Sequence, residues 1–312
     1  EKAGCSAPPL RGGTRQSSNA GASGGVGLRA AAPGAGSGAR GASHRDYGEG
    51  LISAAELLTG SGMQVVETGR SRDEFEQGHL PGAMHVLWER LWRPIDGVEG
   101  MLPPPGEVAA TVGELGLDPA RPVVVYDHHG GARAGRLLFV LDMLGFRELL
   151  LLDGGLDAWI SLGAPLEQGK AISPGFVRLT NVPDRWSNVI SLRELVARLD
   201  EVDVLDTRTP EEFRGVDVRA RHAGRIPDAV NIDWRQNVDP QTRTLESPQV
   251  LRELYQPYLD STRPLVLMCQ SGRRSCQSWY VLRLLGRREN VLIYDGSWTE
   301  WGNRDDVPIE TG

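Results

Sequence analysis

The sequence predicts an α/β protein made of two tandem copies of one small domain, each a parallel sheet with helices on both faces. Two observations predict this fold class: strand-like and helix-like patterns alternate, and the whole series occurs twice. In the first half, MQVVET (63–68), VVVYD (123–127) and LLLLDGG (149–155) contain the short apolar runs of buried parallel strands. SAAELLTG (53–60) and AGRLLFVLDMLG (134–145) have the apolar spacing of helices.

Three blocks of sequence recur in the same order, which indicates a duplicated domain. Two of the blocks share one offset of 142 residues, and the third has a slightly different offset. The matched pairs are RPVVVYDHHGGARAGRLLFVLDMLGF (121–146) with RPLVLMCQSGRRSCQSWYVLRLLG (263–286), DGGLDAW (153–159) with DGSWTEW (295–301), and FEQGHLPGAMHVLW (75–88) with RHAGRIPDAVNIDW (221–234). The common offset places Asp127 of the first copy where the second has Cys269.

The repeat divides the chain into four segments. We expect a first domain at residues 49–168 and a second at 186–312, joined by a Pro- and Gly-containing linker at 169–185. Residues 1–48 are mostly Gly, Ala, Ser and Arg, and such a composition predicts a disordered leader or tail. An Arg- and Ser-rich, acid-poor segment is also typical of a targeting peptide, so an organelle or export is the alternative to the cytoplasm.

Composition excludes several classes of protein. A net charge of −7 over 312 residues argues against a general nucleic-acid binder, and no apolar run reaches the ~18 residues of a membrane span. Three cysteines at 5, 269 and 276 form neither a disulfide framework nor a zinc pattern. We therefore expect no metal and no cofactor. The adjacent His128 and His129 do not change this expectation, because neighbouring histidines on a turn rarely ligate one ion.

Cys269 is the candidate nucleophile, because it ends an apolar strand at the sheet edge where α/β proteins bind ligands. Gly272 allows a tight turn, and a helix is expected to begin near Arg274 or Ser275. Amide N–H groups, the helix dipole and two arginines there favour a thiolate. A sulfur carrier, a phosphatase nucleophile and an inert core cysteine all remain open at this point. Cys276, inside the expected helix, suits core packing, or alternatively a reversible disulfide with Cys269.

The chain resembles the rhodanese (thiosulfate/3-mercaptopyruvate sulfurtransferase) family in its tandem-domain form. FEQGHLPGAMHV (75–86) is similar to the family's F-x-x-x-H-[LIV]-P-G-A signature, and YDGSWTEW (294–301) to its C-terminal signature. CQSGRR (269–274) has the six-residue length of the family's active loop. The resemblance covers about residues 50–312.

The resemblance implies transfer of sulfane sulfur through a Cys269 persulfide to cyanide, a thiol or a thioredoxin-like protein. The first domain, with Asp127 at the cysteine position, is then non-catalytic and forms one wall of an interdomain cleft. A monomer is the expected state. The residues expected to bind substrate around Cys269 are Gln270, Ser271, Gly272, Arg273, Arg274, Ser275, Arg208 and Trp234. Arg208 pairing with Asp206, and core packing of Trp234, are the alternatives for those two.

Loop length and composition address the reaction and the donor. The C-x4-R spacing from Cys269 to Arg274 is one residue shorter than the C-x5-R of phosphatases with this fold. Ser271 and Gly272 match the loop of the mercaptopyruvate enzymes. In those enzymes the counterparts of Ser271 and His79 are proposed to relay a proton. Glu212, however, replaces the arginine that binds the carboxylate in those enzymes. This departure and the two loop arginines favour thiosulfate, with 3-mercaptopyruvate as the alternative, and a persulfide-carrying or redox-sensing module as a second alternative.

Overall fold

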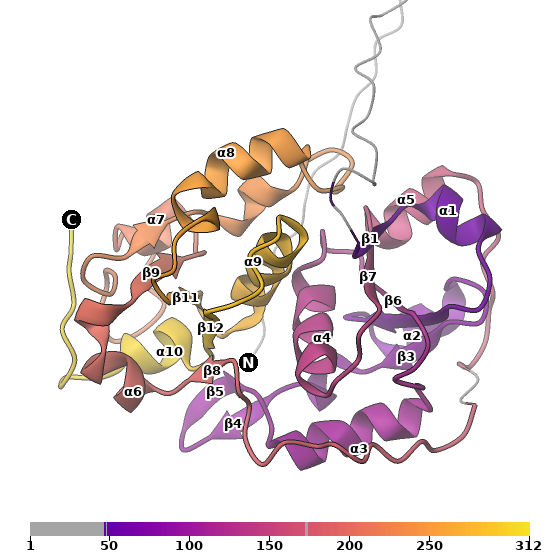
Figure 1. Ribbon diagram of the computed structural model, residues 1–312, viewed down its shortest axis with the longest axis horizontal. Coiled ribbons are helices and arrows are strands. Elements are labelled where there is room, and N and C mark those ends of the chain that lie inside the picture. Colours follow the sequence, from indigo (N-terminus) through magenta and orange to yellow (C-terminus); the bar gives the residue numbers. More distant parts are fainter. Residues whose placement is uncertain (1–46, 48, 172–173) are drawn as a thin grey trace, which may run out of the picture. The chain divides into compact units, whose positions relative to one another are not determined.

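The computed structural model of the chain describes residue 47 and residues 49–171 and 174–312. These residues form two five-stranded parallel sheets and one two-stranded antiparallel hairpin (Figure 1). The strand order is β1-β7-β6-β2-β3 in the first sheet and β8-β12-β11-β9-β10 in the second. Because each strand of the second sheet takes the place of its counterpart in the first, the predicted duplication and fold class are confirmed.

The strands are short and follow the predicted apolar runs. In the first sheet they are β1 (Leu51–Ile52), β2 (Gln64–Thr68), β3 (Met84–Val86), β6 (Val123–Tyr126) and β7 (Leu149–Leu152). In the second they are β8 (Val189–Ile190), β9 (Asp203–Asp206), β10 (Val230–Asn231), β11 (Leu265–Met268) and β12 (Val291–Tyr294). The hairpin consists of β4 (Arg93–Ile95) and β5 (Val98–Met101). The central strands β6 and β11 are buried along their whole length, as their uniformly apolar sequences predict.

Helices cover both faces of each sheet (Figure 1). Those of the first domain are α1 (Ala54–Thr59), α2 (Arg72–Gln77), α3 (Pro105–Leu115), α4 (Ala132–Met143) and α5 (Gly155–Ser161), with the 3-10 helix η2 (Trp88–Arg90). Those of the second are α6 (Leu192–Ala197), α7 (Pro210–Phe213), α8 (Pro248–Leu259), α9 (Arg273–Leu284) and α10 (Ser297–Trp301), with η3 (Leu199–Glu201) and η4 (Trp234–Asn237). Capping boxes begin α1, α2, α6 and α7, so the same Ser/Thr-x-x-Glu pattern starts equivalent helices in both domains.

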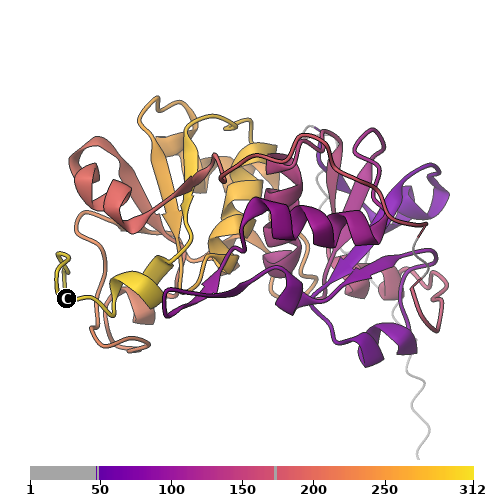
Figure 2. The ribbon, with the colours of Figure 1, turned by 90° about the horizontal axis from the view of Figure 1, so that it is seen from below.

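One apolar core joins the two domains. Buried residues of α3, α4, α8 and α9 belong to a single cluster that includes strands of both sheets, while separate clusters lie under α1 and α5 and under α6 and α10. α4 and α9 pack side by side (Figure 1 and Figure 2). There Phe139 and Trp279 meet edge to face with ring centroids 4.9 Å apart. The Tyr280 hydroxyl reaches the first domain, where it lies within hydrogen-bond distance of the Gly50 and Leu149 carbonyl oxygens (2.7 and 2.8 Å).

Each domain also covers the loop that follows the central strand of the other. Gly100 on β5 packs against Ser271: a Cβ added to Gly100 would lie 2.7 Å from the Ser271 Cβ. In the reverse direction, the Arg243 guanidinium donates to the His128 carbonyl oxygen (2.5 Å). The aspartates of the two repeated Asp-Gly motifs fix these crossings: Asp295 accepts from the Leu102 N–H and Asp153 from the Leu245 N–H.

The predicted linker at 169–185 contains no helix or strand among its described residues. The Val177 N–H donates to the Gly113 carbonyl oxygen of α3 (3.0 Å), and Leu179 and Val182 pack against the shared core. The predicted leader at 1–48 lies outside the described residues except for Tyr47. Tyr47 is 4% exposed and belongs to the shared core. Within the described part of the chain, no helix is both long and apolar enough to span a bilayer.

Candidate active site

Cys269 follows β11 at the carboxyl edge of the second sheet, next to the end of β9. Its side chain is only 1% exposed. Residues 270–272 form the turn, and α9 begins at Arg273, one residue earlier than the sequence suggested. Gly272 has φ +70°, in the left-handed region that favours glycine. A Cβ there would lie 2.5 Å from Asp295 Oδ1, so the site also requires the absence of a side chain.

The C-terminal signature holds this loop in place. The Ser297 hydroxyl accepts the N–H groups of Cys269 and Gly272, both at 3.1 Å, and donates to the Tyr294 carbonyl oxygen. The Trp298 N–H donates to the Cys269 carbonyl oxygen (3.0 Å). The segment 294–301 therefore fixes the backbone of Cys269 by hydrogen bonds.

The surroundings of Cys269 favour a thiolate. Burial alone would raise the pKa of the thiol. The positive charge of Arg274, the N–H groups of Ser275 and Ser271, and the Ser275 hydroxyl outweigh that effect, and the pKa is lowered from 9.0. Ser275 is fully buried, and its Oγ has no well-aligned partner among the described residues. The Ser275 hydroxyl is therefore available to donate a hydrogen bond to the Cys269 sulfur.

Arg274 is held by a carboxylate. Its guanidinium makes a bidentate pair with Glu212 at 2.6 and 2.8 Å, and the Glu212 side chain is buried. Burial opposes the carboxylate charge, but the hydrogen bonds and the attraction of Arg274 lower the pKa of Glu212 to about 2. Glu212 thus fixes Arg274 beside the thiol, and Arg274 is not free to neutralise a donor by itself. Sequence reasoning noticed Glu212 only as a missing arginine.

Arg273 has no carboxylate partner in the described part of the chain. Burial and the neighbouring cations lower the pKa of its guanidinium, although the negative charge of Cys269 opposes this shift. Its Cζ lies 5.6 Å from the ring centroid of Trp88, which comes from the first domain. Arg273 lines a cavity of about 280 Å³ at the mouth of the loop. The other lining residues are Trp88, Trp92, Glu99, Gly100, Gln270, Ser271 and Thr299.

The first domain contributes a further contact to the loop. Arg136 of α4 is 1% exposed; one of its Nη1 contacts is an ion pair with Asp295, and another is a hydrogen bond to the Gly272 carbonyl oxygen (3.4 Å). Its Nη2 donates to the Gly100 carbonyl oxygen (3.0 Å). This one side chain joins the hairpin of the first domain to the active loop of the second. Sequence reasoning missed it, although Arg136 directly precedes the apolar run 137–141 of α4.

The equivalent loop of the first domain is filled by its own carboxylate. Asp127 Oδ1 accepts the N–H groups of His129 and Gly131, and Oδ2 accepts those of Arg133 and Ala134, at 2.8 to 3.0 Å. The loop amides that could hold an external anion are therefore occupied from within, which gives a physical reason for the expected loss of catalysis in this domain. The rings of His128 and His129 lie in tilted contact, with centroids 4.0 Å apart.

Arg208 is committed to the interior of the second domain. It is 1% exposed, forms a bidentate pair with Asp206, donates to the Gly224 carbonyl oxygen and lies 4.3 Å from the Trp298 ring centroid. These contacts match the alternative in which Arg208 pairs with Asp206. Trp234 is half-buried and faces the first domain, where a Cβ on Gly130 would lie 3.8 Å from its ring. Trp88, its counterpart in the repeat, lines the cavity at the active loop together with Trp92.

His79 lies in the first domain. It is 1% exposed, its Nδ1 is 2.9 Å from the Phe75 carbonyl oxygen, and its ring stacks on Phe75. None of the contacts recorded for it among the described residues involves the loop of Cys269, so the geometry gives no support to a proton relay. Cys276 is fully buried, and its Sγ donates to the Gly272 carbonyl oxygen (2.9 Å). Burial raises the pKa of Cys276 to about 12.

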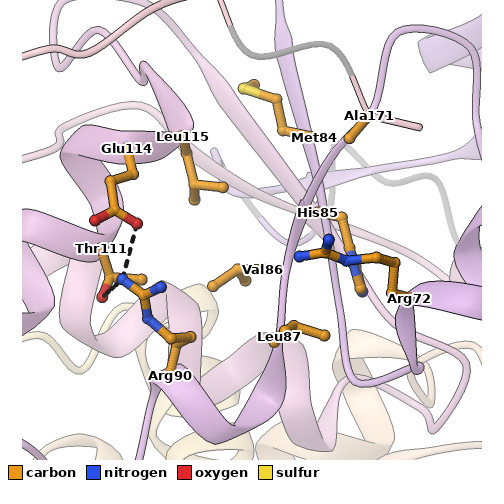
Figure 3. Close-up of a pocket in the computed structure, with 10 residues that line it drawn as sticks. All are labelled: Arg72, Met84, His85, Val86, Leu87, Arg90, Thr111, Glu114, Leu115 and Ala171. Atoms are coloured by element: carbon orange, nitrogen blue, oxygen red, sulfur yellow. Dashed lines mark hydrogen bonds and ion pairs between the residues drawn. The ribbon is translucent and has the colours of Figure 1, made fainter.

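A second cavity of about 240 Å³ lies in the first domain (Figure 3). Its polar rim contains Arg72, His85 and Arg90, and Arg90 is already bonded to Thr111 and Glu114. None of the residues that line it belongs to the loop of Cys269. In the described part of the chain, no cluster of three His, Cys, Asp or Glu side chains is placed to hold a metal ion.

Known proteins resemble the chain over most of its length. Residues 53–162 and 191–304 match the family model of the rhodanese-like domain. A thiosulfate sulfurtransferase of Azotobacter vinelandii is 34% identical over 261 residues, which covers 83% of this chain and 93% of that protein. One of Pseudomonas aeruginosa is 34% identical over 243 residues (77% and 88%), and a sulfur carrier protein of Thermus thermophilus 31% over 274 residues (82% and 94%).

Solved structures share the fold. The wild-type structure of EanB superimposes with a TM-score of 0.73 at 22% identity, over 84% of this chain and 69% of that chain.

Proposed function

Because the chain belongs to the rhodanese family, with two tandem domains, we propose that it is a thiosulfate sulfurtransferase whose catalytic residue is Cys269. The observation that carries the proposal is the buried thiol whose pKa is lowered by Arg274 and by the loop amides. Such a setting stabilises an anion on sulfur, whether a thiolate or a persulfide.

The reaction proceeds as two displacements. The Cys269 thiolate attacks the outer sulfur of thiosulfate, the bond to the sulfonate sulfur breaks, and sulfite leaves with the electron pair. The enzyme now has a persulfide at Cys269. Cyanide or a thiolate attacks its outer sulfur, and Cys269 leaves as a thiolate, with thiocyanate or a new persulfide as product. The amides of Ser271 and Ser275 stabilise the anionic sulfur at each stage.

The charges around the loop favour thiosulfate as donor. Arg273 is free of carboxylate partners among the described residues and lines the cavity, so it can meet the sulfonate. A mercaptopyruvate enzyme needs a cation for the substrate carboxylate, and here that position is Glu212, which already holds Arg274. His79, the second member of the relay in those enzymes, packs in the first domain.

A sulfur carrier that serves a protein partner is the second candidate. One relative, 31% identical, is named a sulfur carrier protein, and this supports the same role for the present chain. The 1% exposure of Cys269 favours small molecules instead, because a folded partner reaches such a thiol poorly. The cavity of about 280 Å³ is large enough for a small donor.

We further propose a cytoplasmic monomer that passes sulfur to cyanide, small thiols or a thioredoxin-like reductant. A reducing compartment keeps Cys269 in the free thiol form that it has here. The pairing of the two domains, which bury α4 and α9 against each other, supports the proposal of a monomer. A targeted location would depend on residues 1–48.

Thiocyanate formation from thiosulfate and cyanide tests the proposal. We expect turnover by the wild type, none above background for Cys269→Ser, and wild-type rates for the control Cys276→Ser, whose hydroxyl can replace the thiol as donor to Gly272. Equal rates for the wild type and Cys269→Ser would refute the proposal. Parallel assays with 3-mercaptopyruvate decide the donor. If mass spectrometry detects a persulfide on Cys269 and its sulfur passes only to a protein acceptor, the chain is a sulfur carrier.

A further inference from the structure

Two arginines without carboxylate partners share one tryptophan at the domain interface. The Cζ of Arg133 lies 5.9 Å and that of Arg273 lies 5.6 Å from the ring centroid of Trp88. Arg273 is the first residue of α9, and Arg133 is the second residue of α4. α4 is the helix that corresponds to α9 in the domain without the thiol. Each loop therefore supplies one guanidinium to the same indole.

Four other arginines at these loops and strand ends have carboxylate partners. The pairs are Arg70 with Glu67, Arg136 with Asp295, Arg208 with Asp206, and Arg274 with Glu212. Within the described residues, neither Arg133 nor Arg273 has a carboxylate within ion-pair distance. Burial lowers the pKa of Arg273, the negative charge of Cys269 raises it, and the positive charge of Arg133 lowers it again, as expected for two cations that repel each other. Two positive charges without carboxylate partners that repel each other are a cost to the fold that a bound anion would reduce.

The surroundings of Arg133 keep it in place. Gly69, with φ +106°, leaves room for its stem, since a Cβ there would lie 2.5 Å from the Arg133 Cδ. The Arg133 Nε is buried and has no partner in the described part of the chain, and the same is true of the Trp92 Nε1 at the cavity. Both are hydrogen-bond donors that an anion could satisfy, and the Glu99 carboxylate and the Gln270 amide are acceptors of the same wall.

We infer that Arg133, from the domain without the cysteine, makes the cavity beside Cys269 selective for divalent anions. Arg273 lines the cavity and meets the anion directly, while Arg133 acts as a positioning charge through Trp88. Together they match the two negative charges of thiosulfate and of the sulfite that leaves. This inference rests on the proposed function for its substrate, but the anion position can be measured without turnover.

Two sulfane-sulfur donors that differ in charge test the inference: thiosulfate, a dianion, and methanethiosulfonate, a monoanion. Because the attraction is proportional to the charge of the ligand, Arg133→Gln lowers kcat/KM for thiosulfate about tenfold and for methanethiosulfonate about threefold. The maximal rate at saturating donor stays, since Arg133 touches no reacting atom. Arg133→Lys restores most of the preference. The matched control is Arg193→Gln, an exposed residue of α6 that removes the same charge far from any loop contact recorded here.

Binding to Cys269→Ser protein separates this inference from the proposed function. Calorimetric titration with thiosulfate gives a Kd about tenfold weaker when Arg133→Gln is added. If the wild type turns over no thiosulfate but this difference in Kd appears, the sulfurtransferase proposal fails and the anion position stands. Equal losses for the dianion and the monoanion, or a Kd that does not depend on Arg133, would overturn the inference. Thermal melting of each variant confirms that the loss is not one of folding.

Discussion

Replacing Glu212 with Gln removes the carboxylate charge beside the active loop while keeping the shape of the side chain. Gln resembles the protonated carboxylic acid, so the substitution measures how much the fold gains from the charged form. Glu212 is 1% exposed and accepts both Arg274 and the Thr209 N–H. The loss therefore includes the attraction to a buried guanidinium, but not the packing of the side chain.

The pKa of Glu212 gives the size of the effect. The pKa falls from 4.5 to about 2, and at 1.36 kcal/mol per unit the charged form adds about 3 kcal/mol to the free energy of unfolding. Since the folded pKa is the lower one, this contribution is complete above about pH 4.5 and is lost as the pH falls toward 2. Glu212→Gln should thus cost about 3 kcal/mol at pH 7 and progressively less in acid.

Urea denaturation at pH 7 and at several values below pH 4.5 measures this difference. Glu211→Gln is the matched control, because Glu211 is the adjacent residue, is exposed, and pairs with Arg214 only at 3.5 Å. We expect the control to lose less than about 0.5 kcal/mol. A loss for Glu212→Gln no larger than that of the control, or one that does not shrink in acid, would refute the reasoning about the Arg274 pair.

Two further changes test the loop. Iodoacetamide should alkylate Cys269 with a pH midpoint below the ordinary 9.0, and the double substitution of Glu212 and Arg274 by Gln should raise that midpoint; an unchanged midpoint would contradict the role of Arg274. Gly272→Ala should abolish thiocyanate formation and lower Tm, because its Cβ meets Asp295 at 2.5 Å. Gly82→Ala has the same φ of +70° but open space around it, so only the strain of about 1 kcal/mol is expected there, and equal effects of the two would contradict the steric argument.

The fold followed from local patterns that the chain carries twice. The apolar runs at 123–126 and 265–268 are strands buried on both faces, and such strands have few alternatives once helices flank them. Cys269 could be found for the same reason, because the end of a central parallel strand has a fixed place in the fold. Gly272 followed too, since a tight turn into a helix needs a residue that tolerates positive φ.

The partners of the loop could not be found in this way, because they depend on how two domains pack. Trp234 was expected at the cavity on account of its own domain, but it faces the loop of the other one, and Trp88 takes the expected place. The repeat contained that signal, since the two tryptophans end equivalent blocks of sequence. Arg136 and Gly100 reach the loop only after α4 has packed on α9.

Glu212 shows a different limit. Its sequence position indicated the loss of a cation, and nothing local indicated that its carboxylate would meet Arg274, 62 residues further along the chain. Such a pair forms across the edge of the sheet, where the ends of neighbouring strands converge. Residues that act on a thiol through space are thus visible only once the strand order is known.

The crossing of each domain over the loop of the other links anion binding to the cohesion of the domains. Trp88 and Gly100 belong to the first domain, while Ser271 and Arg273 belong to the second, and the cavity exists only while α4 and α9 stay packed. By linkage, an anion that binds there must stabilise that packing by the free energy it gains on binding. Thiosulfate is therefore expected to raise the Tm of both domains together. A substitution that loosens the contact of Phe139 with Trp279 is expected to weaken thiosulfate binding at a distance.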